Sequence, residues 1–401
     1  MTLPKISLCM IVKNESRFLA DCLDSAQSVC SQMIVIDTGS DDQSIEIARR
    51  KGAEVYEHPW PGHFSKARNI SLSYATGDWI LILDGDEILN QSTLEELTAI
   101  TSAESTTQAY EFEIVNFSTE EASLESAHYQ RQVRLFRNRP EHRYAGLIHN
   151  QLVNTETNVA LAGPFLPIQV YHYGYIPSVW SAQNKAARLG MLEKALSENP
   201  ESLFCHYNLA NHLKILGEHA RALAHYLPCF DGDLSLPWVQ MSFFSAAFCA
   251  NKIKQFQLAI ECAEKLLDTH PHIADAHLRR AEALMELGRP DLVIQVLEPV
   301  VGHPDLYAFK TQTTRFTLPY RLACAYFKTN QYEKALGYFL PLAEFTSDET
   351  VFTHICICAL QVEDSALALE SYRAGIELAP KDPDWVKIKA LLQQHGAWKD
   401  A

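Results

Sequence analysis

Short apolar runs alternate with amphipathic stretches along the first 90 residues. Runs of strand length at 6–12, 33–36 and 79–83 are almost entirely apolar, which is typical of strands buried on both faces of a parallel sheet. Between them, apolar residues recur at helical spacing after Ser16, the expected N-cap, and again over 64–74. This alternation of strands and helices predicts an α/β fold built from βαβ units, with a mostly parallel, Rossmann-like sheet.

The pattern changes twice in the rest of the chain. Over 110–175 apolar and polar positions alternate, which predicts further strands. From about residue 180 the periodicity is helical, with a period near 34 that is typical of tetratricopeptide repeats. Small residues recur 12 positions apart, as Ala210/Ala222, Ala247/Ala259, Ala323/Ala335 and Cys356/Ala368. We therefore predict an α/β domain over 1–178 and an all-α tetratricopeptide-repeat solenoid of about five repeats over 179–401.

Charge and cysteine content narrow the class of protein. The 401 residues include 34 Lys and Arg against 49 Asp and Glu, a formal net charge of −15. Such a chain would repel nucleic acid and anionic lipid, so we expect neither as a partner. The ten cysteines form no C-x-x-C pair, as expected in a reducing cytoplasm. No run reaches the ~18 apolar residues of a membrane span, so a cytoplasmic location is expected.

An acidic cluster follows the apolar run at 79–83 directly. Asp84, Asp86 and Glu87 lie within four residues, separated by Gly85. Ligands of open α/β sheets bind just beyond the carboxyl ends of the strands. Because clustered carboxylates repel one another, a hard divalent cation such as Mg²⁺ or Mn²⁺ would fit them. The alternative is a simple turn, since Asp-Gly is a strong turn signal.

A second acidic loop follows the run at 33–36. Its tetrapeptide Asp37-Thr38-Gly39-Ser40 also marks aspartic proteases, but those are all-β folds and a helical pattern follows here. Asp37 could accept a hydrogen bond from a uracil N–H or a ribose hydroxyl, or the loop could be a glycine turn in which Asp42 caps the next helix. Neither a P-loop nor a G-x-G-x-x-G motif is present.

Taken together, these motifs resemble the family 2 glycosyltransferases of GT-A fold. The matching segments, in the family's order, are 7–15, 35–42, 64–69 and 84–87. Segments 134–137 and 144–150 resemble the sublancin-type peptide S-glycosyltransferase branch of the family. The resemblance implies that residues 1–178 form a GT-A glycosyltransferase domain.

The resemblance also assigns nucleotide-sugar contacts. It implies that Asp37 and Asp42 surround the nucleobase and ribose of a UDP-sugar, and that Glu15 lies near the nucleotide. Arg68 and Asn69 would lie beside the diphosphate or the base.

Metal ligands and a general base are implied as well. Asp84-Gly85-Asp86 resembles the D-x-D element, in which Asp86 coordinates Mg²⁺ or Mn²⁺ and Asp84 reaches the ribose or a metal-bound water. His172 resembles a histidine that completes the metal shell, although a lone histidine is more often structural. The leading candidates for the base are Glu87 and His149, because Asn150 stands where related sequences often carry a glutamate.

The resemblance therefore implies an inverting, metal-dependent hexosyltransferase of family 2 that uses a UDP-sugar, with glucose or N-acetylglucosamine as the sugar. The acceptor would be a peptide or protein side chain, which the repeats could hold, or a glycan; a homodimer is compatible with the solenoid. The alternative is a non-catalytic tetratricopeptide adaptor with a degenerate transferase domain. The intact Asp84 and Asp86 favour the enzyme, and Asn150 favours the adaptor.

Overall fold

The computed structural model of the chain describes residues 5–93, 97, 106–124, 127–148, 150–179, 182–309, 313–346 and 348–398. It divides into two compact units, residues 1–200 and 201–401. Helix α5 (Ala182–Glu198) is therefore grouped with the first unit. The limit of the glycosyltransferase domain between residues 178 and 179 stays a prediction.

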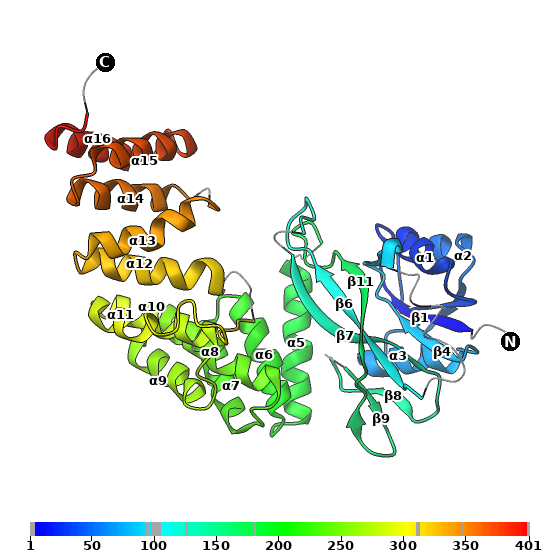
Figure 1. Cartoon of the computed structure of the whole chain (residues 1–401). Helices are drawn as coiled ribbons and strands as arrows, with labels where there is room; N and C mark the ends of the chain where they lie inside the picture. Colours follow the sequence, from blue (N-terminus) through cyan, green and yellow to red (C-terminus); the bar gives the residue numbers. More distant parts are fainter. Residues whose placement is uncertain are drawn as a thin grey trace. The chain divides into compact units, whose positions relative to one another are not determined.

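A mixed eight-stranded sheet forms the centre of the first unit (Figure 1). Its order is β3-β2-β1-β4-β7-β6-β11-β5. The first four strands are mutually parallel, β11 is parallel to β6, and β7 and β5 are antiparallel to their neighbours. The strands are β1 (Ile6–Val12), β2 (Gln32–Asp37), β3 (Glu54–Glu57), β4 (Trp79–Ile82), β5 (Glu87–Leu89), β6 (Ala109–Asn116), β7 (His128–Arg137) and β11 (Phe165–His172). The expected mostly parallel α/β sheet is confirmed.

Both faces of this sheet are covered, which explains why its parallel strands are apolar throughout. On β1, Leu8 and Met10 face one core together with Leu23 of α1 (Leu19–Gln27), and α2 (Ser44–Arg50) adds Ile47. The intervening Cys9 faces a second core with Leu72 of α3 (Phe64–Ser73). A smaller sheet contains β8 (His142–Ala145), β9 (Gln151–Asn154) and β10 (Val159–Ala160).

The expected cap at Ser16 is wrong. Helix α1 begins at Leu19, and its N-cap position is Phe18, which makes no side-chain cap hydrogen bond. The backbone N–H of Ser16 instead donates to Oδ2 of Asp42 at 3.0 Å, across two loops at the same sheet edge. This tertiary contact replaces a local cap because the segment must turn toward the second loop before the helix starts.

The second unit consists of antiparallel helix pairs stacked in chain order (Figure 1). The small residues expected at the helix crossings are fully buried, as are Ala210 and Ala222 in the first pair, so the helices can approach closely. The paired helices are α6 (Leu203–Ile215) and α7 (His219–Tyr226), α8 (Pro237–Lys252) and α9 (Phe256–Leu267), α10 (Ala274–Glu286) and α11 (Pro290–Leu297), α12 (Leu318–Lys328) and α13 (Tyr332–Ala343), and α14 (Glu349–Gln361) and α15 (Ser365–Leu378). Helix α16 (Asp384–Gln394) follows the last pair. Within the described residues, no helix has the length and apolar character needed to cross a bilayer.

Candidate active site

The acidic loops meet at one edge of the large sheet. Strands β2, β1 and β4 are parallel neighbours, so the loops that follow them leave from the same edge. Strand β2 ends at Asp37, and the loops after β1 and β4 carry Glu15 and the pair Asp84 and Asp86. The sheet topology therefore brings together acids that lie up to 71 positions apart in the sequence.

Glu15 is packed into this acidic cluster. A Cβ atom at Gly85 would lie 2.7 Å from Cγ of Glu15, so only glycine lets the two loops approach so closely. Burial, followed by the charges of Asp86 and Asp84, raises the pKa of Glu15 to about 8. Burial and the two neighbouring carboxylates thus oppose ionisation of Glu15, and a bound cation would favour its ionised form.

Asp84 is held by two arginines. Its Oδ1 lies 2.5 Å from Nη2 of Arg68 on α3, and its Oδ2 lies 3.9 Å from Nη1 of Arg134 on β7. Burial opposes ionisation, but the two positive charges outweigh it and lower the pKa of Asp84 to about 2. Nε and Nη1 of Arg68 are buried and have no hydrogen-bond partner among the described residues. Asp84 is therefore an ionised anchor, and Arg68 retains donors for an anionic ligand.

Glu87 is buried next to Asp84. Its side chain is 1% exposed, forms an ion pair with Arg134, and accepts the backbone N–H of Asp84 through Oε2 at 2.9 Å. Burial is the main cause that raises the pKa of Glu87, against the lowering effect of Arg134. Both oxygens are occupied, so the geometry favours a role in shaping the Asp84 loop. Its role as general base stays a prediction. His149, the other candidate, lies outside the described residues.

Asp86 faces His172 at the end of β11. Oδ2 of Asp86 lies 3.5 Å from Nε2 of His172, while Nδ1 of His172 donates to Oδ1 of Asn116 at 2.7 Å. Burial disfavours the protonated imidazole, but the hydrogen bond and charge of Asp86 outweigh it and raise the pKa of His172. A Cβ atom at Gly174 would lie 2.6 Å from Nε2 of His172 and would clash with Asp86. Glycine thus keeps a space open between the two predicted metal ligands.

The loop after β2 presents one unused acceptor. Oδ1 of Asp37 accepts the backbone N–H groups of Gly39 and Ser40 at 2.9 and 3.0 Å. Its Oδ2 is buried and has no partner in the described part of the chain. Buried acceptors are rarely left unpaired, so this atom is available to a ligand N–H or O–H.

Asp42 stabilises the loops around it. Its oxygens accept the backbone N–H groups of Ser16 and Ser44. Burial opposes ionisation, but the hydrogen bonds from Ser44 and Ser16 lower the pKa of Asp42 to about 2. The side chain is exposed, so it can still face a ribose while it holds the loop that carries Glu15.

Asn69 is not part of the acidic cluster. Its amide donates to the carbonyl of Tyr144 on β8 and accepts the backbone N–H of the same residue, both at 2.9 Å. Both ends of the amide are thereby used to fix α3 against the small sheet. The expected contact of Asn69 with the donor stays a prediction, and the structure gives this residue a separate positioning role.

Sequence reasoning missed three contributors: Arg134, Asn116 and Gly174. Each acts through a partner on another strand or loop, Asn116 because it lies beside His172 in the register of β6 and β11. The only sequence signal was the 134–137 segment, which carries Arg134 inside an alternating strand pattern.

The first unit has the sheet of a GT-A-type domain, with an acidic edge that arginines hold in place. Helical repeats follow it, as in a tetratricopeptide array. The sequence model described as "Glycosyl transferase family 2" matches residues 7–150. The first unit therefore contains a domain of glycosyltransferase family 2.

Two curated relatives are similar to about half of this chain. A TPR repeat-containing protein of Synechococcus elongatus is 36% identical over 208 residues, 50% of each chain. The SPbeta prophage-derived glycosyltransferase SunS of Bacillus subtilis is 30% identical over 210 residues, 50% of this chain and 48% of SunS. The chain thus spans about half the length of the curated relatives it matches.

Two solved structures are similar to about half of the chain as well. The TPR protein YrrB, described with an unusual peptide-binding site, has a TM-score of 0.41 and 21% identity, covering 50% of this chain and 97% of YrrB. Pseudomonas aeruginosa pilF has a TM-score of 0.42 and 15% identity, covering 52% of this chain and 90% of pilF.

Proposed function

We propose that the chain is an inverting, divalent-metal-dependent glycosyltransferase that transfers a sugar, glucose or N-acetylglucosamine, from a UDP-sugar. The acceptor is a peptide or protein side chain, or a glycan. The observation that carries the proposal is the acidic cluster of Glu15, Asp84 and Asp86 at the carboxyl edge of the sheet, where burial and then the two aspartate charges raise the pKa of Glu15. The match of residues 7–150 to family 2 and the similarity to SunS support the same activity.

The residues present fit a divalent cation. Asp86 offers a carboxylate oxygen and His172 an imidazole nitrogen on either side of the space that Gly174 leaves open. This mixed donor set suits Mn²⁺ at least as well as Mg²⁺, which prefers oxygen ligands. When bound, the cation supplies positive charge that stabilises the departing diphosphate.

The chain's own residues would orient the donor. Oδ2 of Asp37 would accept a hydrogen bond from the nucleobase, and the unpartnered nitrogens of Arg68 would donate to the phosphates. Asp84 and Glu87, braced by Arg134, would hold the loop that presents Asp86. Donor and cation are then positioned before the acceptor attacks.

Deprotonation of the acceptor is the step for which the described residues offer the fewest candidates. Glu87 is enclosed by Arg134, which leaves His149 as the candidate base that sequence reasoning supplies. A thiol acceptor would need little help, because thiols ionise near neutral pH and the thiolate is the nucleophile. We propose a cysteine side chain or another readily ionised group as the acceptor, with the repeats as its binding surface.

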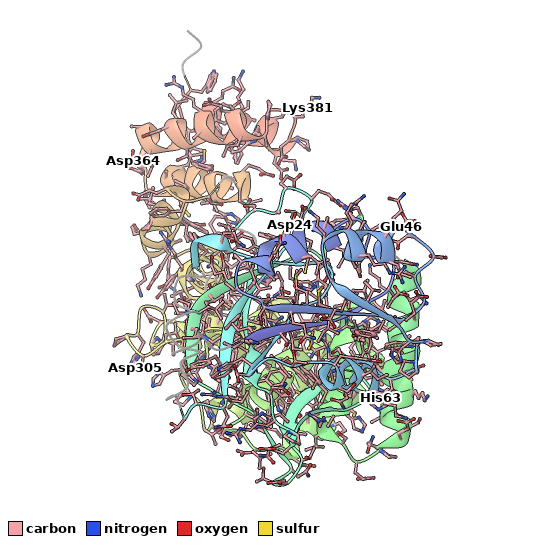
Figure 2. The ribbon with its side chains drawn as sticks, turned by 90° about the vertical axis from the view of Figure 1, so that its right-hand side faces the viewer. Asp24, Glu46, His63, Asp305, Asp364 and Lys381 are labelled. Carbon is pink, nitrogen blue, oxygen red and sulfur yellow. The ribbon has the colours of Figure 1, made fainter. Side chains whose placement is uncertain are left out.

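Nucleotide binding tests the proposal. UDP is titrated into the full chain with and without Mn²⁺, and Asp86→Asn is compared with Asp24→Asn. Asp24 is an exposed residue that pairs with Lys51 away from the cluster and is labelled in Figure 2. We expect binding that requires Mn²⁺ in wild type and Asp24→Asn and is lost in Asp86→Asn.

Turnover gives a second measurement. Asp86→Asn should lower sugar transfer by roughly 10²-fold or more, because charge stabilisation at the diphosphate is lost. Near-wild-type transfer in that variant would remove the metal assignment. Absence of any UDP affinity in wild type would favour the adaptor, the alternative to which Asn150 points.

A further inference from the structure

A second potential ligand site lies in the repeat unit, where an insert meets the turn between two helices. The turn after α9 contains His272, and the insert after α11 contains Tyr307. The backbone N–H of Tyr307 donates to the carbonyl of His272 at 3.0 Å, and the N–H of Ala274 donates to the carbonyl of Tyr307 at 2.8 Å. Ile273 and Tyr307 form a parallel β-bridge. The insert is therefore fixed in register against the turn.

This pairing brings three metal-ligating side chains together. His272, His303 and Asp305 each offer one ligand atom, and these atoms lie within 4.8 Å of one another. Nδ1 of His303 is 4.0 Å from Oδ2 of Asp305, and the rings of His272 and His303 stack with their centroids 4.6 Å apart. Figure 2 labels Asp305 on its loop, drawn in yellow. Two imidazoles and a carboxylate thus converge from two different segments.

The contacts of these groups leave ligand atoms available. Nδ1 of His272 is buried and has no hydrogen-bond partner among the described residues. The carboxylate of Asp305 is 73% exposed. Nδ1 of His303 accepts the backbone N–H of Asp305 at 3.2 Å, so Nε2 is the nitrogen of that ring left for a cation among the described contacts. A buried ring nitrogen without a partner is unusual in a folded protein. A bound cation would supply the missing partner.

We propose that His272, His303 and Asp305 bind a borderline divalent cation, with Zn²⁺ as the best match. Imidazole nitrogen suits Zn²⁺ better than it suits Mg²⁺, and two histidines, one aspartate and a water complete a tetrahedral shell. The rings lie at 17° to each other, so each must turn about its Cβ–Cγ bond for the lone pairs to meet. The side chain of His303 is 36% exposed, which gives its ring room for that rotation.

The bound cation would act as a clip. It would join the turn before α10 to the insert after α11 through side chains, in addition to the backbone bridge that already joins them. A ligand that binds the folded form and not the unfolded one raises stability. The site shares no residue with the acidic cluster in the first unit, so a test of Zn²⁺ binding here does not test the proposed transferase activity.

Calorimetric titration of the full chain with Zn²⁺, in excess Mg²⁺ to occupy oxygen-rich sites, tests the clip. We expect one Zn²⁺ site whose affinity falls at least about tenfold in His272→Ala, His303→Ala and Asp305→Asn. The matched control is His270→Ala in the same turn, because both nitrogens of His270 already have partners, Thr269 and Gln240.

Melting temperatures measured without and with Zn²⁺ distinguish loss of the metal site from failure to fold. His303→Ala and Asp305→Asn change partly exposed side chains, so an unchanged melting temperature without metal shows that they fold. Zn²⁺ should raise the melting temperature of wild type and not of these variants. The proposal would be overturned if both variants bound Zn²⁺ as tightly as wild type, or if wild type had no Zn²⁺ site. It would also be overturned if His206→Ala, which disrupts the separate His206–His225 pair, abolished the site.

Discussion

The protonation of Glu15 reports the charge of the acidic cluster. Its pKa, 4.5 in an unfolded chain, rises to about 8 in the folded protein. Between these values the folded state retains a proton that the unfolded state has lost, so stability should fall as pH rises from 4.5 to about 8. Glu15→Gln should flatten this decline.

The measurement is urea unfolding across that pH range without added metal. Glu46→Gln is the matched control, since Glu46 is an exposed residue of α2 labelled in Figure 2. Mn²⁺ should reverse the decline in wild type at the upper end of the range, because a cation favours the ionised carboxylate. An identical pH profile for Glu15→Gln and wild type would contradict the assignment.

Asn116 should control how well His172 binds a cation. By accepting the Nδ1 proton, it leaves Nε2 as the nitrogen that would give its proton up and bind a cation beside Asp86. Partners that orient a ligating histidine typically change metal affinity 10–100-fold. Asn116→Ala should therefore weaken Mn²⁺ binding by about tenfold, whereas Asn116→Asp, which keeps an acceptor, should retain it.

Isothermal titration with Mn²⁺ in the presence of UDP measures this effect. Repeating Asn116→Ala in a His172→Ala background provides the control, because the second substitution should then add nothing. An equal loss in both backgrounds would mean that Asn116 acts on stability rather than through His172.

At the scale of elements, the turns inside the five helix pairs of the repeat unit share one conformation. The first residue beyond the C-cap of α6, α8, α10, α12 and α14 has φ between +59° and +79°. These residues are Gly217, Lys254, Gly288, Asn330 and Glu363. The next backbone N–H closes each turn on a carbonyl of the helix, as Asp364 does on Ala359 at 2.8 Å. This is the Schellman arrangement, in which glycine is favoured.

Glu363→Gly should therefore stabilise the chain by about 0.5–1 kcal/mol, since Glu363 is exposed and glycine adopts this φ without strain. Lys254→Gly should behave in the same way. The control is Glu370→Gly inside α15, which should destabilise by about 1 kcal/mol. Chemical denaturation followed by circular dichroism gives the comparison, and a loss of stability in Glu363→Gly would contradict the turn assignment.

Elements were predictable from the sequence wherever their pattern was local. The strand β1 and helix α3 follow from apolar periodicity, and the shared edge of β1, β2 and β4 follows from the parallel direction of strands joined in βαβ units. The predictions that failed depended on contacts between residues far apart in the sequence. Ser16 does not cap α1, because its backbone N–H donates to Asp42 on another loop. Arg134 reaches Asp84 because β7 pairs with β4, and no local sequence pattern encodes that pairing.

At the scale of the whole molecule, net charge sets which partners can approach. With 49 acidic against 34 basic residues, the chain should not retard duplex DNA in a gel even at low ionic strength, because a negatively charged protein cannot neutralise the DNA phosphates. A basic peptide should instead associate faster as salt is lowered, since long-range attraction is screened over about 10 Å at 0.1 M. Stopped-flow association of matched peptides that differ only in Lys or Glu tests this. If the acidic peptide associates as fast as the basic one, or if DNA is retained in a salt-sensitive way, a local basic surface rather than net charge governs recognition.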